Sequence, residues 1–272
     1  GAGMNIWGGR AIIENNSITD NSFQGISGYS SGAGIMWANL SYPGTIEELI
    51  IRNNIIAGNE GSTHNAAGGG GGFGTGFGWD EEIRIYNNLI CNNYITGNGG
   101  GIYNYRSPLL IYNNTIYNNE STTGGNSMSF GQGECVMYNN VIWSDVENSL
   151  PDINFWEGNI NSLLVFNNIL KEPFAQNSKI SEEWNNYLQP VFKPDSYEPA
   201  ENSPAIGRGV DSVPISDVWD YAPMKVLAGN DRPDPVDSYV DLGAYESEFS
   251  RPVFPTADLA NIVLPEFDLN PE

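Results

Sequence analysis

The chain has 272 residues, of which 40% are hydrophobic, so it is long enough to bury one large core or two small ones. Its 33 acidic and 11 basic residues give a formal net charge of −22, which argues against nucleic acid as a partner and against anionic membrane surfaces. No apolar run approaches the ~20 residues of a membrane span, so we expect no membrane insertion.

A pair of asparagines recurs between branched and aromatic apolar residues along the first part of the chain. The phrases are "AIIENNSITDN", "LIIRNNIIAGN", "IRIYNNLICNN", "LLIYNNTIYNN", "CVMYNNVIWSD" and "LLVFNNIL". The pairs begin 38, 34, 26, 26 and 28 residues apart, at Asn15, Asn53, Asn87, Asn113, Asn139 and Asn167. Asparagine is disfavoured inside both helices and strands, so its return in one context indicates a repeated architectural position.

A glycine-rich phrase precedes most of these pairs, as in "GAGMNIW", "GAGIMW", "GGGIYNY" and "GGNSMSF". Each unit therefore combines a glycine run, a short strand, a turn, a second strand and the Asn pair. Repeats of 20–50 residues are typical of solenoids and propellers. The strands are too short and too few per unit for propeller blades, and no helical period appears. The sequence predicts an all-β chain with about six coils of a parallel β-helix, stacked roughly 4.8 Å apart. The first residues already resemble the middle of a repeat, so we expect further coils to precede them.

The asparagines suit the sharp bends that such coils need, because asparagine tolerates the left-handed region of the Ramachandran plot. Stacked coils would also bring equivalent amides together, and a ladder of hydrogen bonds would satisfy them where they are buried. We predict that the first residue of each pair forms this ladder. The alternative is that the pairs mark exposed hairpin turns, although hairpins favour Asn-Gly.

Residues 1–170 resemble the right-handed parallel β-helix, or pectate-lyase-like, superfamily. The phrases "NSPAIGRG", "GNDRPDP" and "VDLGAYE" at 202–246 resemble the segment that closes secreted bacterial β-helix proteins whose C-terminal anchors vary, with Gly207-Arg208 in place of the usual acidic pair. The resemblance implies a right-handed solenoid, export to the bacterial surface or the extracellular space, and a C-terminal anchor or secretion machinery as a partner. It implies no single activity, because such families include lyases, hydrolases and adhesins.

Composition shifts after Leu170 toward proline and acidic residues, without the glycine phrase. We expect residues 171–249 to lie over the open end of the coils, because a solenoid needs a cap. Residues 250–272 are rich in proline and acid, which predicts an extended linker.

Counting back from each Asn pair predicts a stripe of outward aromatic side chains on one face. Strand alternation places the aliphatic positions Met4, Ile6, Ile102, Met128 and Phe130 inside. The outward stripe consists of Trp7, Trp79, Tyr103, Tyr105 and Trp156. Exposed aromatic rings in line would stack against the sugars of a polysaccharide or cell-surface glycan. The alternative is that loops cover these rings, which then form a second, lateral core.

Two small groups of charged residues would suit catalysis. Asp80 and Arg106 align on adjacent coils and would supply parts of a lyase site; a surface salt bridge is the alternative. Glu82 and Glu134 fall two coils apart, roughly 9.6 Å, at the outer limit of the separation in an inverting glycosidase.

Calcium is the only cofactor that the sequence suggests, at the acidic residues Asp231, Asp234, Asp237 and Asp241; a solvated acidic loop is the alternative. His64 is the single histidine, which argues against a His-dependent triad. Cys91 and Cys135 fall two coils apart, farther than the ~7 Å between Cα atoms that a disulfide allows, so we expect free thiols.

The leading hypothesis is therefore a secreted or surface-attached bacterial β-helix that contacts glycans along one face without catalysis. A polysaccharide lyase or glycoside hydrolase is the first alternative, and a structural spacer or exported cargo is the second.

Overall fold

The computed structural model describes residues 3–25, 32–38, 48–63, 68–76, 82–155, 160–175, 177–215 and 218–249. Within these ranges the regular elements are all β-strands. None of the described residues belongs to a helix long and apolar enough to cross a membrane.

Two large parallel sheets, here called A and B, run along the described part of the chain. Sheet A contains β1 (Met4–Trp7), β5 (Ile35–Ala38), β9 (Phe73–Thr75), β13 (Ile102–Asn104), β17 (Met128–Phe130) and β20 (Ile153–Phe155). Sheet B contains β2 (Ala11–Glu14), β6 (Glu48–Arg52), β10 (Glu82–Tyr86), β14 (Leu109–Tyr112), β18 (Gly133–Tyr138), β21 (Ile160–Phe166) and β23 (Ile180–Glu183).

Sheets C and D complete the parallel arrangement. Sheet C contains β3 (Ser17–Thr19), β7 (Ile55–Ala57), β11 (Leu89–Cys91), β15 (Thr115–Tyr117), β19 (Val141–Trp143) and β22 (Ile169–Leu170). Sheet D contains β4 (Ser22–Gln24), β8 (Glu60–Ser62), β12 (Tyr94–Ile95) and β16 (Glu120–Ser121). A separate antiparallel hairpin is formed by β24 (Ser212–Ile215) and β25 (Val218–Tyr221).

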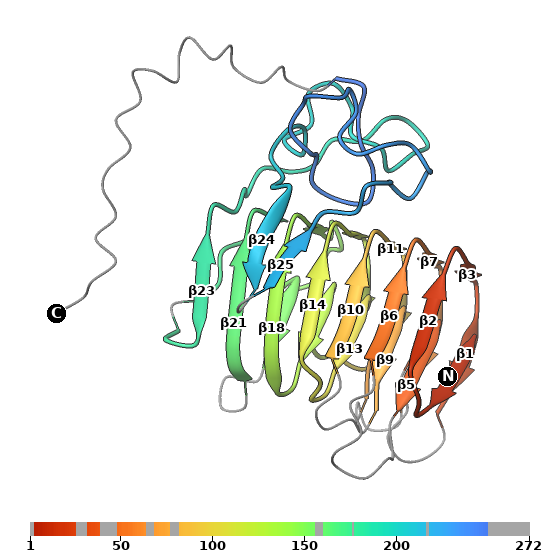
Figure 1. Ribbon diagram of the computed structural model, residues 1–272. Coiled ribbons are helices and arrows are strands. Elements are labelled where there is room, and N and C mark those ends of the chain that lie inside the picture. The colour runs from red at the N-terminus through yellow and green to blue at the C-terminus, as the bar shows by residue number, and fades with distance from the viewer. Residues whose placement is uncertain are drawn as a thin grey trace, which may run out of the picture.

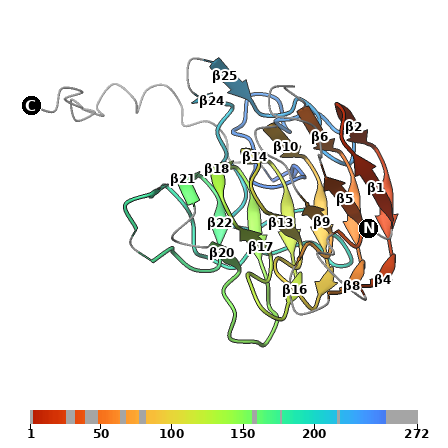
Figure 2. The same cartoon turned by 90° about the horizontal axis from the view of Figure 1, so that it is seen from below.

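The chain visits these sheets in a fixed order, which makes successive passes equivalent. In the first four passes it runs from A to B to C to D and then returns to A, where the next strand pairs in parallel with the one before; after β19 it returns to sheet A without a sheet D strand, and after β22 it leads to β23 of sheet B. We call each pass a coil. Figure 1 shows the strands of sheet B side by side from β2 to β23, and Figure 2 shows the stack from below. The predicted parallel pairing of successive repeats is confirmed.

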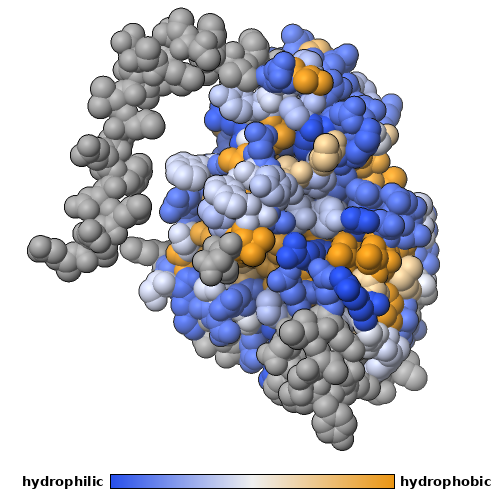
Figure 3. All heavy atoms as spheres, in the orientation of Figure 1, coloured by the Kyte–Doolittle hydropathy of each residue, from blue (hydrophilic) through white to orange (hydrophobic). Residues whose placement is uncertain are grey.

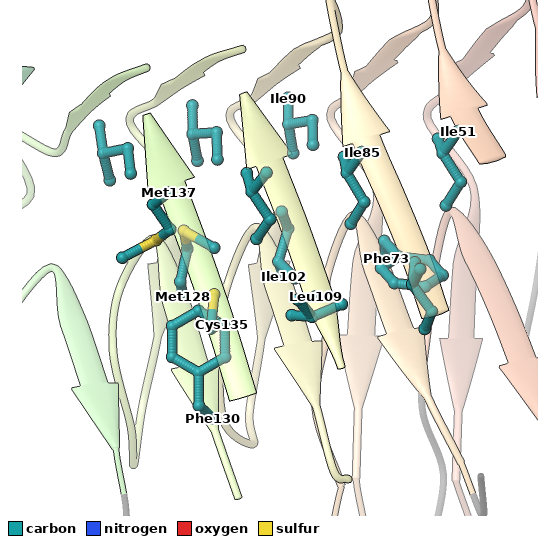
Figure 4. Packing of buried hydrophobic residues seen from close by; sticks show 14 of the residues in the cluster. Ile51, Phe73, Ile85, Ile90, Ile102, Leu109, Met128, Phe130, Cys135 and Met137 are labelled. Atoms are coloured by element: carbon teal, nitrogen blue, oxygen red, sulfur yellow. The ribbon is translucent and has the colours of Figure 1, made fainter. Parts of the chain in front are cut away.

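The core lies between the sheets and consists of columns of equivalent apolar side chains. One column of sheet B contains Ile13, Ile51, Ile85, Ile111, Met137 and Val165. One column of sheet C contains Ile18, Ile56, Ile90, Ile116, Ile142 and Leu170. Figure 4 shows members of these columns with Phe73, Ile102 and Met128 of sheet A. The predicted inward positions of β1, β13 and β17 all belong to this cluster.

The first asparagine of each pair makes the bend between sheets B and C. Its backbone is left-handed in every coil, with φ between 50° and 58° at Asn15, Asn53, Asn87, Asn113, Asn139 and Asn167. Asparagine adopts this conformation more readily than other residues with a β-carbon. The recurrence of asparagine here is therefore a backbone requirement, as expected from the bend.

The ladder itself runs through the second asparagine, so the predicted ladder positions are wrong by one residue. The backbone N and the Nδ2 of one amide both donate to the Oδ1 of the next, at 2.9–3.1 Å, along Asn16, Asn54, Asn88, Asn114, Asn140, Asn168 and Asn185. Among the predicted residues, Asn87 donates to Asn53 Oδ1 at 2.6 Å, but no continuous series forms. The left-handed first residue directs its side chain away from the core, while the second faces inward and stacks.

A second ladder, which the sequence analysis did not predict, lies between sheets C and D. Asn21, Asn59, Asn93 and Asn119 repeat the same two bonds at 2.8–3.1 Å. The residue before each is again left-handed: Asp20, Gly58, Asn92 and Asn118 have φ between 51° and 64°. The first two corner residues are not asparagine, which hides this ladder from a search for Asn-Asn.

Aromatic rings stack along the outer face of sheet B. Tyr86, Tyr112, Tyr138 and Phe166 have ring centroids 4.7, 4.9 and 5.5 Å apart, with interplanar angles of 14° or less. The β24–β25 hairpin lies on this face (Figure 1), where Tyr138 donates to Asp220 Oδ2 at 2.7 Å and Val213 is buried. In the same view, Figure 3 shows a largely hydrophilic surface with separate hydrophobic patches.

The C-terminal region only partly follows the expected cap. Its first strand, β23, extends sheet B beyond β21, so the coil geometry continues past Leu170. The remainder packs along the side of the coils: Gly243 N donates to Asn139 O at 2.8 Å, and Ala244 N donates to Thr115 Oγ1 at 3.1 Å. The apolar outer residues of sheet C need cover, and Leu242 and Ala205 supply it.

A buried ion pair joins two loops of this cover. Arg232 Nε donates to Glu246 Oε1 at 2.7 Å, and both side chains are 1% exposed. Arg232 also donates to Gly243 O, while Glu246 accepts from Asp241 N. The pair thus fixes the "DLGAYE" segment against the coils.

The thiols of Cys91 and Cys135 are free and buried, as expected. They lie on β11 and β18, strands of different sheets and different coils.

The two asparagines of one pair should respond differently to substitution. Asn114→Leu removes the acceptor for two bonds from Asn88 and the donor to Asn140, and each orphaned buried group costs about 1–3 kcal/mol. Asn113→Gly keeps a residue that accepts φ of 52°, so the free energy of unfolding should change by about 1 kcal/mol or less. Urea denaturation of both variants measures this difference, and equal losses would contradict the division of roles.

Breaking the buried ion pair should destabilise the C-terminal cover strongly. Arg232→Met leaves the Glu246 carboxylate buried without its cation, which costs about 3–5 kcal/mol. Lys225→Met is the matched control, because the Lys225–Asp231 pair is largely exposed and should contribute little. Denaturant unfolding followed by tryptophan fluorescence compares them; similar midpoints would show that the buried pair is dispensable.

Candidate functional site

The predicted aromatic stripe is not continuous among the described residues. Pairing places Ala38 beside Trp7, and the same column continues through Gly76, Tyr105 and Gly131. Trp7 is 60% exposed, but Tyr103 is buried and Tyr105 is half-buried. Two small residues therefore separate Trp7 from Tyr105.

The error in register has a simple cause. The interval from the first sheet A residue to the Asn pair differs between coils, since Phe73 pairs with Ile102 although it lies three residues farther from its own pair. Counting back from Asn87 therefore assigned Trp79 to a column that Gly76 occupies. Trp79 and Trp156 themselves lie outside the described residues.

Two of the predicted catalytic residues, Glu82 and Glu134, lie in different surroundings. Glu82 forms an ion pair with Arg84 at 2.5 Å, within a row of alternating charges that includes Glu48 and Arg10. Glu134 is exposed two coils away, with Pro108 between, as the alignment predicted.

Arg106 stacks on the side chain of the residue that precedes it in the chain. Its guanidinium carbon lies 4.9 Å from the centroid of the Tyr105 ring, a cation–π arrangement. Asp80, its predicted partner, lies outside the described residues, as does His64.

The four predicted calcium ligands do not converge. Asp241 is fully buried and accepts from Gly207 N at 2.6 Å and from Ser247 N at 2.7 Å, so it organises loops. Asp231 pairs with Lys225 at 2.6 Å. Throughout the described ranges, no group of three or more His, Cys, Asp or Glu side chains is close enough to hold a metal ion.

A groove at the C-terminal end of the stack has exposed aromatic side chains in its walls. Its volume is about 730 Å³, and it lies between the end of β23 and two loops of the C-terminal cover. Trp184, Tyr187 and Leu188 form one side, while Arg208 and Tyr239 lie on the other. We call this the aromatic groove.

Trp184 occupies an unusual backbone position in this groove. It is the next member of the corner column after Asn167, and it has φ of 52°. Six asparagines precede it in that column, and a bulky side chain in the left-handed region is uncommon and strained. Its side chain is 76% exposed, so core burial does not explain the choice of tryptophan.

The cover accounts for this exposure. Asn87, Asn113 and Asn139 of the same column are fully buried beneath the C-terminal region. Asn139 exchanges two hydrogen bonds with Val210, for example. Trp184 lies beyond this contact, at the C-terminal end of the column, where the cover leaves the corner exposed.

Contacts with neighbouring residues hold the rest of the Trp184 side of the groove in place. The Tyr187 hydroxyl donates to the Glu182 carboxylate, and burial together with this bond raises the pKa of Tyr187 above its ordinary value. Asn186 continues the coil by donating to Asn168 O at 2.7 Å. The described lining contains an arginine, amides and backbone groups but no carboxylate.

Sequence reasoning missed this site, although "EEWNNYL" carries the signal. This segment contains a further Asn-Asn pair, and Asn185 joins the ladder through Asn168. The two residues are only 17 positions apart, so the last coil is too short to match the earlier spacing.

No protein-family model matches this chain, and it has no significant match among curated proteins or solved structures.

Replacing Trp184 by asparagine should not weaken the fold. The change restores the residue type of the column, and a strained left-handed residue costs about 1–2 kcal/mol, so the free energy of unfolding should stay level or rise by about 1 kcal/mol. The reverse variant Asn15→Trp, at an exposed corner with φ of 58°, should lose stability. Thermal and urea unfolding test both; a clear loss in Trp184→Asn would mean that the indole packs against the protein.

Proposed function

We propose that this chain is a right-handed parallel β-helix of the pectate-lyase-like kind, exported to the surface or surroundings of a bacterial cell, and that it contacts glycans without catalysis. The fold part of the proposal is supported by the repeated order of the sheets and by the two ladders at the corners. The location rests on the resemblance of the C-terminal segment to secreted bacterial proteins.

The observation that carries the glycan proposal is the exposed, strained Trp184 on the wall of the aromatic groove. Strain in the backbone persists where another requirement outweighs it, and a binding site is the usual reason. Tryptophan and tyrosine offer a flat apolar face with a polar edge, which suits the apolar face of a sugar ring and its hydroxyl groups. The groove thus replaces the predicted stripe as the contact surface.

The polar groups of the groove suit hydroxyl-rich ligands. Arg208 and the amide of Asn186 offer polar groups beside the rings. A few such groups on largely apolar walls are typical of sites that bind small organic ligands.

The alternative of a lyase or hydrolase has less support in this groove. Both reactions need a base or an acid beside the scissile bond. The described lining contains no carboxylate, and its one charged side chain is that of Arg208.

The test is retention on a panel of immobilised polysaccharides, with the absorbance of unsaturated products followed in parallel. The parent chain should be retained by at least one polysaccharide, and Trp184→Asn should weaken its binding about tenfold or more. Trp219→Ala is the matched control, since Trp219 is 58% exposed on β25 and does not line the groove.

Each outcome decides between the hypotheses. Equal retention of the parent and Trp184→Asn would place binding elsewhere and refute the groove. Release of unsaturated product would support the lyase. If no polysaccharide retained the parent chain, glycan binding would be refuted and the spacer or cargo hypothesis would be favoured.

A further inference from the structure

A second concavity, here called the end pocket, lies at the last full coil. It has a volume of about 290 Å³ and lies between β20, β22 and the segment Lys171–Ala175. Its apolar walls include Ile142, Leu170 and the rings of Phe155 and Phe174, whose centroids are 6.0 Å apart. It shares no lining residue with the aromatic groove.

The end pocket contains a buried carboxylate that is only half satisfied. Asp152 is 4% exposed, and its Oδ2 accepts from Ser144 N at 2.8 Å. Its Oδ1 is buried and has no hydrogen-bond partner in the described part of the chain. An unpaired buried acceptor is unfavourable, and more so when it is ionised, so the structure leaves this oxygen ready for a donor.

The fold does not itself require a carboxylate here. The strand register aligns Asp152 with Ser127 and Gly101, the residues that precede the sheet A strands of the two earlier coils. The only hydrogen bond that the Asp152 carboxylate accepts in the described part of the chain comes from Ser144 N, and an asparagine at position 152 would accept that bond equally well. The carboxylate therefore adds a second acceptor that the coil geometry does not need.

A cation lies beside this acceptor. Lys171 lines the end pocket, and its Nζ donates to Ser144 O at 2.5 Å, which holds the ammonium near the residue that contacts Asp152. An ammonium can donate further bonds, because it has three hydrogens. An acceptor and a donor in one pocket with aromatic walls complement the hydroxyl groups and the apolar face of a ring.

We propose that the end pocket binds a neutral polyhydroxylated ring the size of one sugar unit. One hydroxyl donates to Asp152 Oδ1, a neighbouring hydroxyl accepts from Lys171, and the apolar face of the ring lies against Phe155 and Phe174. The inference concerns a site separate from the aromatic groove and does not depend on glycan binding there.

Protonation should control this site in a defined direction. Burial raises the pKa of the Asp152 carboxyl to about 6, against the opposing effects of the Ser144 bond and Lys171, while Glu172 and Asp145 raise it further. The ionised carboxylate is the stronger acceptor for a hydroxyl. Affinity should therefore rise as the pH passes upward through about 6 and then level off.

The experiment is calorimetric and NMR titration of the full chain at pH 7 with glucose, galactose, mannose and the open-chain hexitol sorbitol. At least one hexose should bind saturably and more tightly than sorbitol, because only a ring fills the space between the two phenylalanines. Asp152→Asn should weaken that binding about tenfold and make it independent of pH between 5 and 8. Lys171→Met should also weaken hexose binding. This second variant keeps the proposal testable if Asp152→Asn fails to fold.

Trp184→Asn is the control that separates the two sites, because it should leave hexose binding in the end pocket unchanged. Failure of every hexose to saturate would overturn the proposal, as would parent-like affinity and pH dependence in Asp152→Asn. Sorbitol binding as tight as that of the hexoses would overturn the requirement for a ring. Loss of polysaccharide retention without loss of hexose binding would refute only the groove.

Discussion

The amide ladder at the corner between sheets B and C is the constraint on which the rest of the structure depends. Seven consecutive amides, from Asn16 to Asn185, each accept two hydrogen bonds from the coil before or donate two to the coil after. An unpaired buried amide is costly, and a coil that slipped by one residue would orphan donors and acceptors on both sides. The ladder thus fixes the register of every coil. Variation in coil length is confined to the connections that lead into sheet A and from sheet A to sheet B.

That confinement explains what the sequence could and could not predict. Positions near the Asn pairs were predictable: the parallel pairing, the inward columns around Ile51 and Ile85, and the free thiols all follow from counting a few residues from the ladder. The aromatic stripe was not predictable, because counting from Asn87 back to Trp79 crosses a connection whose length differs between coils. The two asparagines of a pair also have different roles: the first supplies the left-handed backbone of the bend, and the second supplies the side chain of the ladder. Spacing along the sequence does not reveal this difference.

The C-terminal region was the least predictable part, for a related physical reason. It has no ladder of its own and follows the surface that the coils present. Its hairpin covers the stacked tyrosines of sheet B, and its "LGAY" segment covers the outer residues of sheet C. The cover is reflected in the sequence of the repeats, because residues on their outer faces are apolar or aromatic and are buried, as at Tyr112, Tyr138 and Val141. Nothing local in residues 187–249 indicates which coils they contact.

Function is best sought where these regularities stop. Inside the stack, each corner position is determined by the ladder and leaves no freedom for chemistry. At its end, two residues depart from the pattern of the earlier coils: tryptophan replaces asparagine in a left-handed corner at Trp184, and a carboxylate takes the position of Ser127 and Gly101 at Asp152. Each substitution lowers the local fit to the fold, through backbone strain in one case and an unpaired oxygen in the other. The strained backbone of Trp184 and the unpaired oxygen of Asp152 both lie at the C-terminal end of the stack, and each lines a concavity. This coincidence favours a binding role for that end over a purely structural one.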